Sequence, residues 1–205
     1  MTAARLLFLL CLPALAQAQD DTATWHIALR GGMHIHEDQA FDFVSEDSVV
    51  GASEIALDRQ IFGPLWVGVA WRAGGSEDRV FDTITTTWTQ NNLQASAMFR
   101  LRPLELMAVY GRLGPAVSRV ELELTTGRRL AADAWTFGGH AGLGVEFFPV
   151  HRSLVEGVEG DFGLGLSLEL TYARYAPVDL QAGTTDLGTF DPSGPGLLMG
   201  LAVQW

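Results

Sequence analysis

The sequence predicts an all-β protein: an eight-stranded antiparallel up-and-down transmembrane β-barrel. Segments of about ten residues alternate apolar side chains with polar or small ones, which is the pattern of a strand that faces lipid on one side. The chain is 48% hydrophobic and has 23 glycines, but no segment has a sustained helical period. Its 205 residues suit a single barrel domain.

Residues 1–18 have the parts of a secretory signal peptide. Arg5 supplies the positive charge, an apolar stretch follows, and a small-x-small cleavage motif ends at Ala18. We expect cleavage there, which leaves residues 19–205 as the outer-membrane β-barrel domain. The apolar stretch is shorter than the roughly 20 residues that a membrane-spanning helix needs. The only cysteine, Cys11, lies in this stretch, so we expect no disulfide in the mature protein.

Four segments alternate clearly enough to be strands on their own evidence. In the first of them, Trp25 and Leu29 share one face, and Arg30 and His34 share the other. The same separation of apolar from small or polar residues recurs in the other three. The four segments are residues 25–36, 135–147, 162–172 and 197–205.

Four weaker segments complete the eight strands: residues 50–61, 65–74, 92–101 and 104–113. The last is the least regular. A phase that directs Glu105 inward turns Arg112 outward, toward lipid. We therefore expect a bulge or a different strand limit in that segment.

The connections alternate in length, as they do in barrels with short periplasmic turns and longer external loops. The breaks at 62–64 and 102–103 are short, whereas the break at 149–160 is longer than expected. The other gaps are long and polar: residues 36–48, 74–87, 118–133 and 176–195. Residues 83–89 and 120–124 look β-like and could extend hairpins beyond the membrane. Residues 183–196, rich in Gly, Thr, Asp and Pro, are expected to form a mobile loop.

An even number of strands places both termini on the periplasmic side. Aromatic residues should then form two girdles at the membrane interfaces. The expected periplasmic girdle is Trp25, Phe99, Phe147, Phe162 and Trp205, and the expected external girdle is Trp71, Tyr110, Trp135 and Tyr172.

The last strand carries the strongest class marker. Apolar residues at alternate positions lead to a final aromatic residue: Leu197, Met199, Leu201, Val203 and Trp205. With this membrane-insertion signal the chain resembles the small outer-membrane β-barrel families, which include opacity-type proteins and the membrane domain of OmpA-like proteins. The resemblance implies insertion by the barrel-assembly machinery and contact with outer-membrane lipid and lipopolysaccharide.

The inward phase contains charged residues of both signs. Because side chains just fill the interior of an eight-stranded barrel, and deep charges must be paired, we expect a structural lumen polar network. Its expected members are His26, Arg30, Glu54, Asp58, Arg72, Arg100, His140, Glu146 and Glu169. The phase assigned to residues 104–113 directs Glu105 inward as well. We expect no catalytic residue, cofactor or metal site.

These features favour a structural or surface-recognition role through external loops, in a monomer. The net charge of −11 argues against a nucleic-acid partner. A narrow porin-like channel is the alternative, and a lipid A modifying enzyme that uses His36, Asp38 and Ser45 is the next.

Two other interpretations start from the same residues. The pair His34 and His36, with His140, could hold a metal, and the acidic loop 36–48 could hold divalent cations that bridge to lipopolysaccharide. A soluble lipocalin-type barrel would have the opposite phase. Charges such as Arg30 and Glu169 would then line its ligand cavity, which disfavours it.

Overall fold

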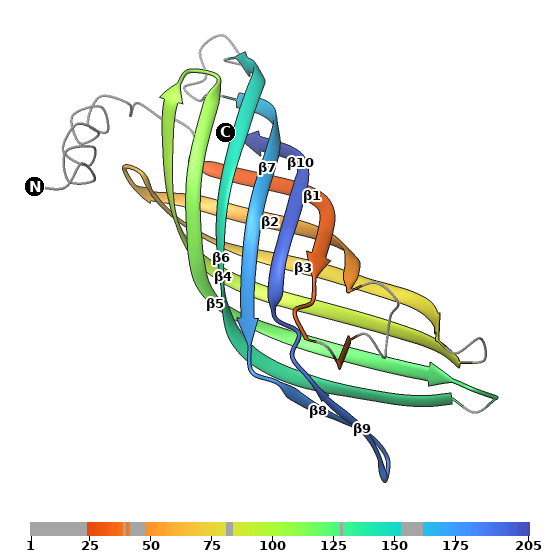
Figure 1. The fold of residues 1–205 in the computed structure, drawn as a ribbon. Helices are drawn as coiled ribbons and strands as arrows, with labels where there is room; N and C mark the ends of the chain where they lie inside the picture. The colour runs from red at the N-terminus through yellow and green to blue at the C-terminus, as the bar shows by residue number, and fades with distance from the viewer. Residues whose placement is uncertain (1–23, 39, 42–47, 81–83, 128, 153–161) are drawn as a thin grey trace, which may run out of the picture.

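Eight strands of the chain close into a ring, and two more form a separate hairpin (Figure 1). The computed structural model describes residues 24–38, 40–41, 48–80, 84–127, 129–152 and 162–205. The barrel strands are β1 (Trp25–Ile35), β2 (Val49–Phe62), β3 (Leu65–Val80), β4 (Ile84–Leu104), β5 (Met107–Thr125), β6 (Arg129–Arg152), β7 (Phe162–Tyr175) and β10 (Gly194–Gln204). The hairpin is β8 (Val178–Ala182) and β9 (Thr185–Phe190). The expected signal peptide, residues 1–18, lies outside the described residues.

Every neighbouring pair of barrel strands is antiparallel and follows the chain order, and β10 closes the ring against β1. The eight-stranded antiparallel up-and-down barrel predicted from the alternation is therefore confirmed. Thr24 and Trp205 are joined by a backbone hydrogen bond of 2.8 Å, so both ends of the described chain lie at one end of the barrel. We call it the turn end, and the opposite one the hairpin end. Among the described residues, no helix is long and apolar enough to cross a bilayer.

The alternation in the sequence becomes an outer apolar face and an inner polar face. Leu29 is 53% exposed while its neighbour Arg30 is 5% exposed. Leu168 is 44% exposed while Glu169 is fully buried. A water-soluble barrel would show the reverse arrangement, so the lipocalin-type phase is wrong for this chain.

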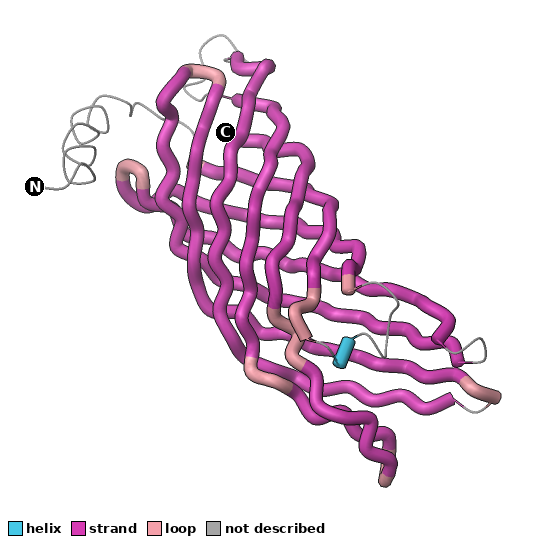
Figure 2. Tube along the Cα trace, viewed as in Figure 1, coloured by secondary structure: helices cyan, strands magenta, loops and turns pink. Residues whose placement is uncertain are grey.

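Strands β3 to β6 continue past the ring at the hairpin end, where the ribbon extends well beyond β1 and β10 (Figure 2). The gaps 74–87 and 118–133 are therefore largely strand, as the β-like stretches within them suggested. The expectation of a mobile loop at 183–196 is wrong. Residues 185–190 form β9, Gly183 turns the β8–β9 hairpin at a φ of +64°, and β10 begins at Gly194.

The segment 104–113 needs a correction, which follows from its strand limit. Glu105 lies in an exposed turn, the β4–β5 register shifts between Leu101 and Leu104, and β5 begins only at Met107. The phase is thereby reversed, so that Arg112 points inward at 3% exposure. Tyr110 is also buried inside the barrel. It does not belong to the external aromatic girdle, and Glu105 does not belong to the lumen.

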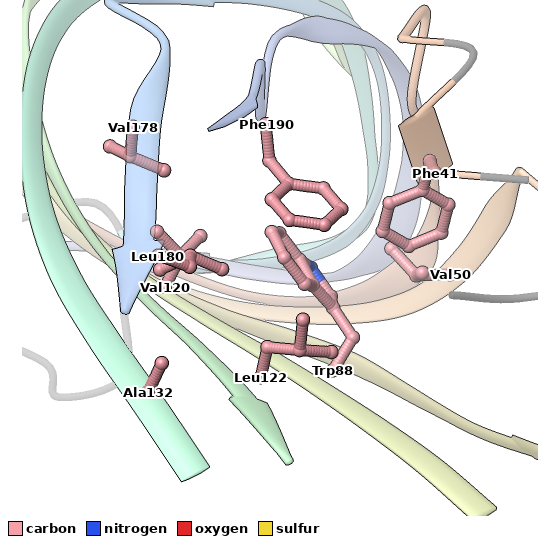
Figure 3. Close-up of a cluster of buried hydrophobic side chains, with 9 residues drawn as sticks. All are labelled: Phe41, Val50, Trp88, Val120, Leu122, Ala132, Val178, Leu180 and Phe190. Atoms are coloured by element: carbon pink, nitrogen blue, oxygen red, sulfur yellow. The ribbon is translucent and has the colours of Figure 1, made fainter. Parts of the chain in front are cut away.

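A cluster of buried apolar side chains lies at the hairpin end, between the extended strands and the β8–β9 hairpin, and we call it the cap cluster (Figure 3). The long strands contribute Trp88, which is fully buried, and the β8–β9 hairpin contributes Leu180 and Phe190 from the other side. The full set is Phe41, Val50, Trp88, Val120, Leu122, Ala132, Val178, Leu180 and Phe190. The hairpin is thus held against the inner face of the extended strands by apolar contact.

Candidate functional site

Glu54 is the centre of an ion-pair network in the middle of the lumen. It accepts hydrogen bonds from Arg30 at 2.8 Å, from Arg112 at 2.7 Å, and from Arg72 at 2.7 and 3.0 Å. Arg30 and Arg72 lie directly beside Glu54 in the strand register, whereas Arg112 reaches it from β5. Three guanidinium groups therefore share one carboxylate that is 4% exposed.

Glu169 is the second acceptor of this network. Its carboxylate lies 2.7 Å from Arg112 and 3.1 Å from Arg30, and it accepts a hydrogen bond of 2.6 Å from the hydroxyl of Tyr110. Arg30 also donates to the Tyr110 hydroxyl at 2.9 Å. We call the joined set the ion belt: Arg30, Glu54, Arg72, Tyr110, Arg112 and Glu169.

A second cluster lies toward the turn end. The ring of His26 has Nδ1 at 3.0 Å from Asp58 and Nε2 at 2.8 Å from Glu146, the latter an ion pair without good hydrogen-bond alignment. Arg100 donates to Glu146 at 3.1 Å and to Gln204 at 2.7 Å. Charge-assisted contacts thus hold β1, β2, β4, β6 and β10 together across the lumen.

Two glycines create the space that these polar groups occupy. A Cβ at Gly144 would lie 2.2 Å from the ring of Tyr110, and one at Gly68 would lie 1.9 Å from Oδ1 of Asp58. The large side chain on one strand therefore packs over the glycine of the next. The small inward face noticed in the sequence of β6 is thus the counterpart of the ion belt.

Most of the residues expected in the lumen network are brought together. His26, Asp58, Arg100 and Glu146 form the second cluster, and Arg30, Glu54, Arg72 and Glu169 enter the ion belt. His140 is buried nearby but has no hydrogen bond to either group. Sequence reasoning missed Arg112 and Tyr110. A strand start at Met107 would have revealed both, because Ala108, Tyr110 and Arg112 then share the inward phase.

No protein-family model and no curated protein matches the sequence, but solved structures match the fold. Neisserial surface protein A aligns with a TM-score of 0.54 at 12% identity, over 88% of this chain and 97% of that one. Ail, the attachment invasion locus protein of Yersinia pestis, aligns with a TM-score of 0.50 at 11% identity, over 89% and 97% of the two chains. The same figures hold for Ail in complex with the heparin analogue sucrose octasulfate. The chain has the fold of the small outer-membrane β-barrels.

Two of the candidate enzyme residues, His36 and Asp38, make contacts within the protein. His36 is 3% exposed and its ring stacks on Phe41 at 4.1 Å. Asp38 accepts backbone hydrogen bonds from Ala40 and Asp191 at 2.9 and 2.7 Å, and Ser45 lies outside the described residues. His34 contacts His36 edge to face at 4.8 Å. Among the described residues, no group of three or more His, Cys, Asp or Glu side chains is placed to hold a metal ion.

The insertion-signal residues lie on β10 and at the final position of the chain. Met199, Leu201 and Trp205 are exposed on the outer face, and Leu197 and Val203 are half-buried there. The outer face also has an open apolar recess of about 640 Å³, whose lining includes Phe99, Leu143 and Tyr172. This recess opens away from the lumen, on the face that the strand phase assigns to lipid.

The part of the barrel beyond the ring has a polar outer face. Arg119 pairs with Glu121 at 3.0 Å and with Asp133 at 3.3 Å, and Arg129 pairs with Glu123 at 2.6 Å. These pairs are solvent-exposed, so each contributes little to stability. They give the outer face of the extended strands charges of both signs.

Proposed function

We propose that the protein is an integral outer-membrane barrel whose lumen does not conduct and whose hairpin end recognises a partner outside the cell. The observation that carries this proposal is the presence of two layers of buried side chains along the lumen. The ion belt fills its centre with side chains no more than 5% exposed, and the cap cluster covers the hairpin end. A solute path would need both layers to move.

Bilayer insertion is supported by the outer face. Phe137 and Leu143 are each 70% exposed, among a belt of apolar side chains that water would disfavour. In this proposal the turn end is periplasmic and the hairpin end is external, with lipid and lipopolysaccharide around the barrel. The barrel-assembly machinery inserts it through β10, and it acts as a monomer.

The charge of the external part indicates the kind of partner. Ail was crystallised in complex with the heparin analogue sucrose octasulfate. Here Arg119 and Arg129 of the extended sheet are paired with Glu121, Glu123 and Asp133, and exposed Arg79 lies on the same strand as Glu77 and Asp78. Exposed Asp179 and Asp186 on the β8–β9 hairpin add further negative charge. A cationic or neutral partner therefore fits this surface better than a sulfated polysaccharide does.

Planar-bilayer recording of the refolded protein tests the closed lumen. We expect no steady current, and reproducible ohmic steps would overturn the proposal in favour of a narrow channel. Mass spectrometry of lipid A from cells with and without the gene tests the enzymatic alternative. A consistent difference in acyl chains, abolished by His36→Ala, would replace recognition with lipid modification.

A further inference from the structure

An arginine lies on the outer face of the barrel near the turn end. Arg59 is exposed on β2, in direct register with Trp25 of β1 and Val67 of β3. Its outward neighbours along β2, Leu57 and Ile61, are exposed apolar side chains. Arg59 is therefore a cation surrounded by side chains that the strand phase assigns to lipid.

The guanidinium of Arg59 stacks on an aromatic ring. Its Cζ lies 5.2 Å from the centre of the Trp25 ring. Within the described part of the chain, no carboxylate forms an ion pair with Arg59, and this includes the C-terminal group of Trp205. Stacking uses the flat face of a guanidinium, whereas its five N–H groups lie in the plane. These donors are left for water or for an anion.

The height of Arg59 on the barrel favours an anion. Ile61 and Phe62 are both exposed and continue the apolar face beyond Arg59 toward the turn end. Arg59 therefore lies inside the edge of the apolar band, and its long side chain extends to the level of the lipid headgroups. Phosphate is the anion of that level, and the fork of a guanidinium binds phosphate through charge-assisted hydrogen bonds.

A recess on the same outer face lies within reach of the chains of such a lipid. It has an open volume of about 440 Å³, and its lining includes Leu29, Ser53, Ile55 and Trp71. Arg59 follows Ile55 by four residues on β2, which is about 13 Å along a strand. One leaflet of the hydrocarbon core is about 15 Å thick. A lipid with its phosphate at Arg59 can therefore place an acyl chain in the recess.

The charge around Arg59 indicates the class of headgroup. Arg59 contributes one positive charge that no carboxylate of the described residues offsets. A net anionic headgroup supplies the missing negative charge. A zwitterionic headgroup would bring an ammonium group of its own to the same place, so it fits less well.

We propose that Arg59 binds the phosphate of an anionic glycerophospholipid in the periplasmic leaflet. The guanidinium donates to the phosphate oxygens while its face stays on the ring of Trp25, and one acyl chain follows β2 into the recess at Ser53 and Ile55. This inference rests on the proposed insertion of the barrel with its turn end in the periplasm. It does not depend on the partner proposed for the hairpin end.

Native mass spectrometry of the refolded protein, released from detergent micelles, tests the site. The probes are phosphatidylglycerol and phosphatidylcholine with identical acyl chains, added in equal amounts. We expect the wild-type protein to retain one phosphatidylglycerol molecule in preference to phosphatidylcholine. Arg59→Gln should lower this preference about fivefold, the effect of one cation near the headgroups. Equal retention of the two lipids by the wild-type protein would overturn the proposal.

Arg174→Gln is the matched control. It makes the same change in an exposed arginine at the hairpin end, which lies 3.8 Å from Asp191, and should leave the preference for phosphatidylglycerol unaltered. An equal loss of preference in both variants would show a general effect of net charge and would contradict a site at Arg59.

Two measurements on the wild-type protein need no variant. Glycerol phosphate carries the charge without the chains, and we expect it not to displace phosphatidylglycerol; displacement at equal concentration would contradict the role of the recess. Folding into phosphatidylcholine vesicles, followed by heat-modifiable gel mobility, tests insertion itself. A chain that does not insert would overturn both this inference and the proposed function. A chain that inserts but shows no preference for phosphatidylglycerol would overturn this inference alone.

Discussion

Glu54→Gln is the substitution that most directly probes the ion belt. Glutamine keeps the shape of the side chain but removes the charge, and its amide group presents hydrogens to guanidinium groups that also only donate. Four nitrogen contacts of 2.7 to 3.0 Å lose their anionic acceptor. Arg30 and Arg112 would keep their contacts with Glu169, whereas Arg72 would lose both of its hydrogen bonds to a carboxylate.

The expected loss follows from this geometry. Removing one partner of a buried ion pair destabilises a protein by about 3–5 kcal/mol, because the remaining charge is left uncompensated. Here three cations are affected, so we expect the free energy of unfolding to fall by at least about 3 kcal/mol. Reversible urea unfolding in phospholipid vesicles, followed by tryptophan fluorescence, measures it.

Glu121→Gln is the matched control, because it makes the same change in an exposed pair with Arg119. We expect it to cost less than about 1 kcal/mol. If the two variants lost the same small amount, the ion belt would not contribute to the stability of the barrel, and the account of the lumen given above would be refuted.

Three further substitutions test other parts of the lumen. Gly144→Ala places a Cβ 2.2 Å from the ring of Tyr110 and should lower the free energy of unfolding by about 1–3 kcal/mol through overpacking. Phe190→Ala removes a ring from the cap cluster, which should cost about 3–5 kcal/mol and speed proteolysis of the β8–β9 hairpin. Burial lowers the pKa of His36 to about 3 from 6.5, so only the unfolded chain gains its proton between those values. The contribution of neutral His36 to the free energy of unfolding is complete above pH 6.5. It falls toward pH 3 by about 1.4 kcal/mol per pH unit. His36→Gln should reduce this pH dependence, measured as the urea midpoint.

Each of these has an internal comparison. Gly51→Ala is the control for Gly144→Ala, because a Cβ at Gly51 meets nothing within 4 Å. An equal loss of unfolding free energy in the two variants would contradict the packing of Tyr110 over Gly144. Thr189→Ala is the control for Phe190→Ala, because it alters an exposed neighbour of Phe190. Equally fast proteolysis of the β8–β9 hairpin in both variants would contradict the role of the cap cluster in holding the hairpin. An unchanged pH profile in His36→Gln would contradict the assignment to that ring.

The period-two pattern was enough to predict the ring and its lipid face. Side chains alternate strictly along a strand, so Leu29 beside Arg30 already assigns both faces locally. The contacts in the lumen were not predictable in the same way. Arg112 meets Glu54 across the barrel, and that depends on the stagger of the closed ring, which no single strand encodes.

Two errors in the structure predicted from the sequence have a local cause. One misplaced strand limit at Met107 inverted the phase of everything that followed it in that segment. The β8–β9 hairpin was misread because Gly183 and its polar neighbours resemble a loop, while its apolar residues, such as Leu180, have a partner only once the extended strands are present. Packing in the cap cluster depends on tertiary contacts, so a short apolar run in the sequence does not predict it.

Closure of the ring by β10 against β1 also constrains how the protein can fold. His26 pairs with Gln204, near the opposite end of the chain, so the last seam joins residues that are almost a full chain length apart. Contacts of such long sequence separation form slowly. Until β10 pairs with β1, the growing sheet has two edge strands whose backbone N–H and C=O groups lack hydrogen-bond partners. Assembly in a bilayer therefore requires that these edges be shielded until the last strand has paired.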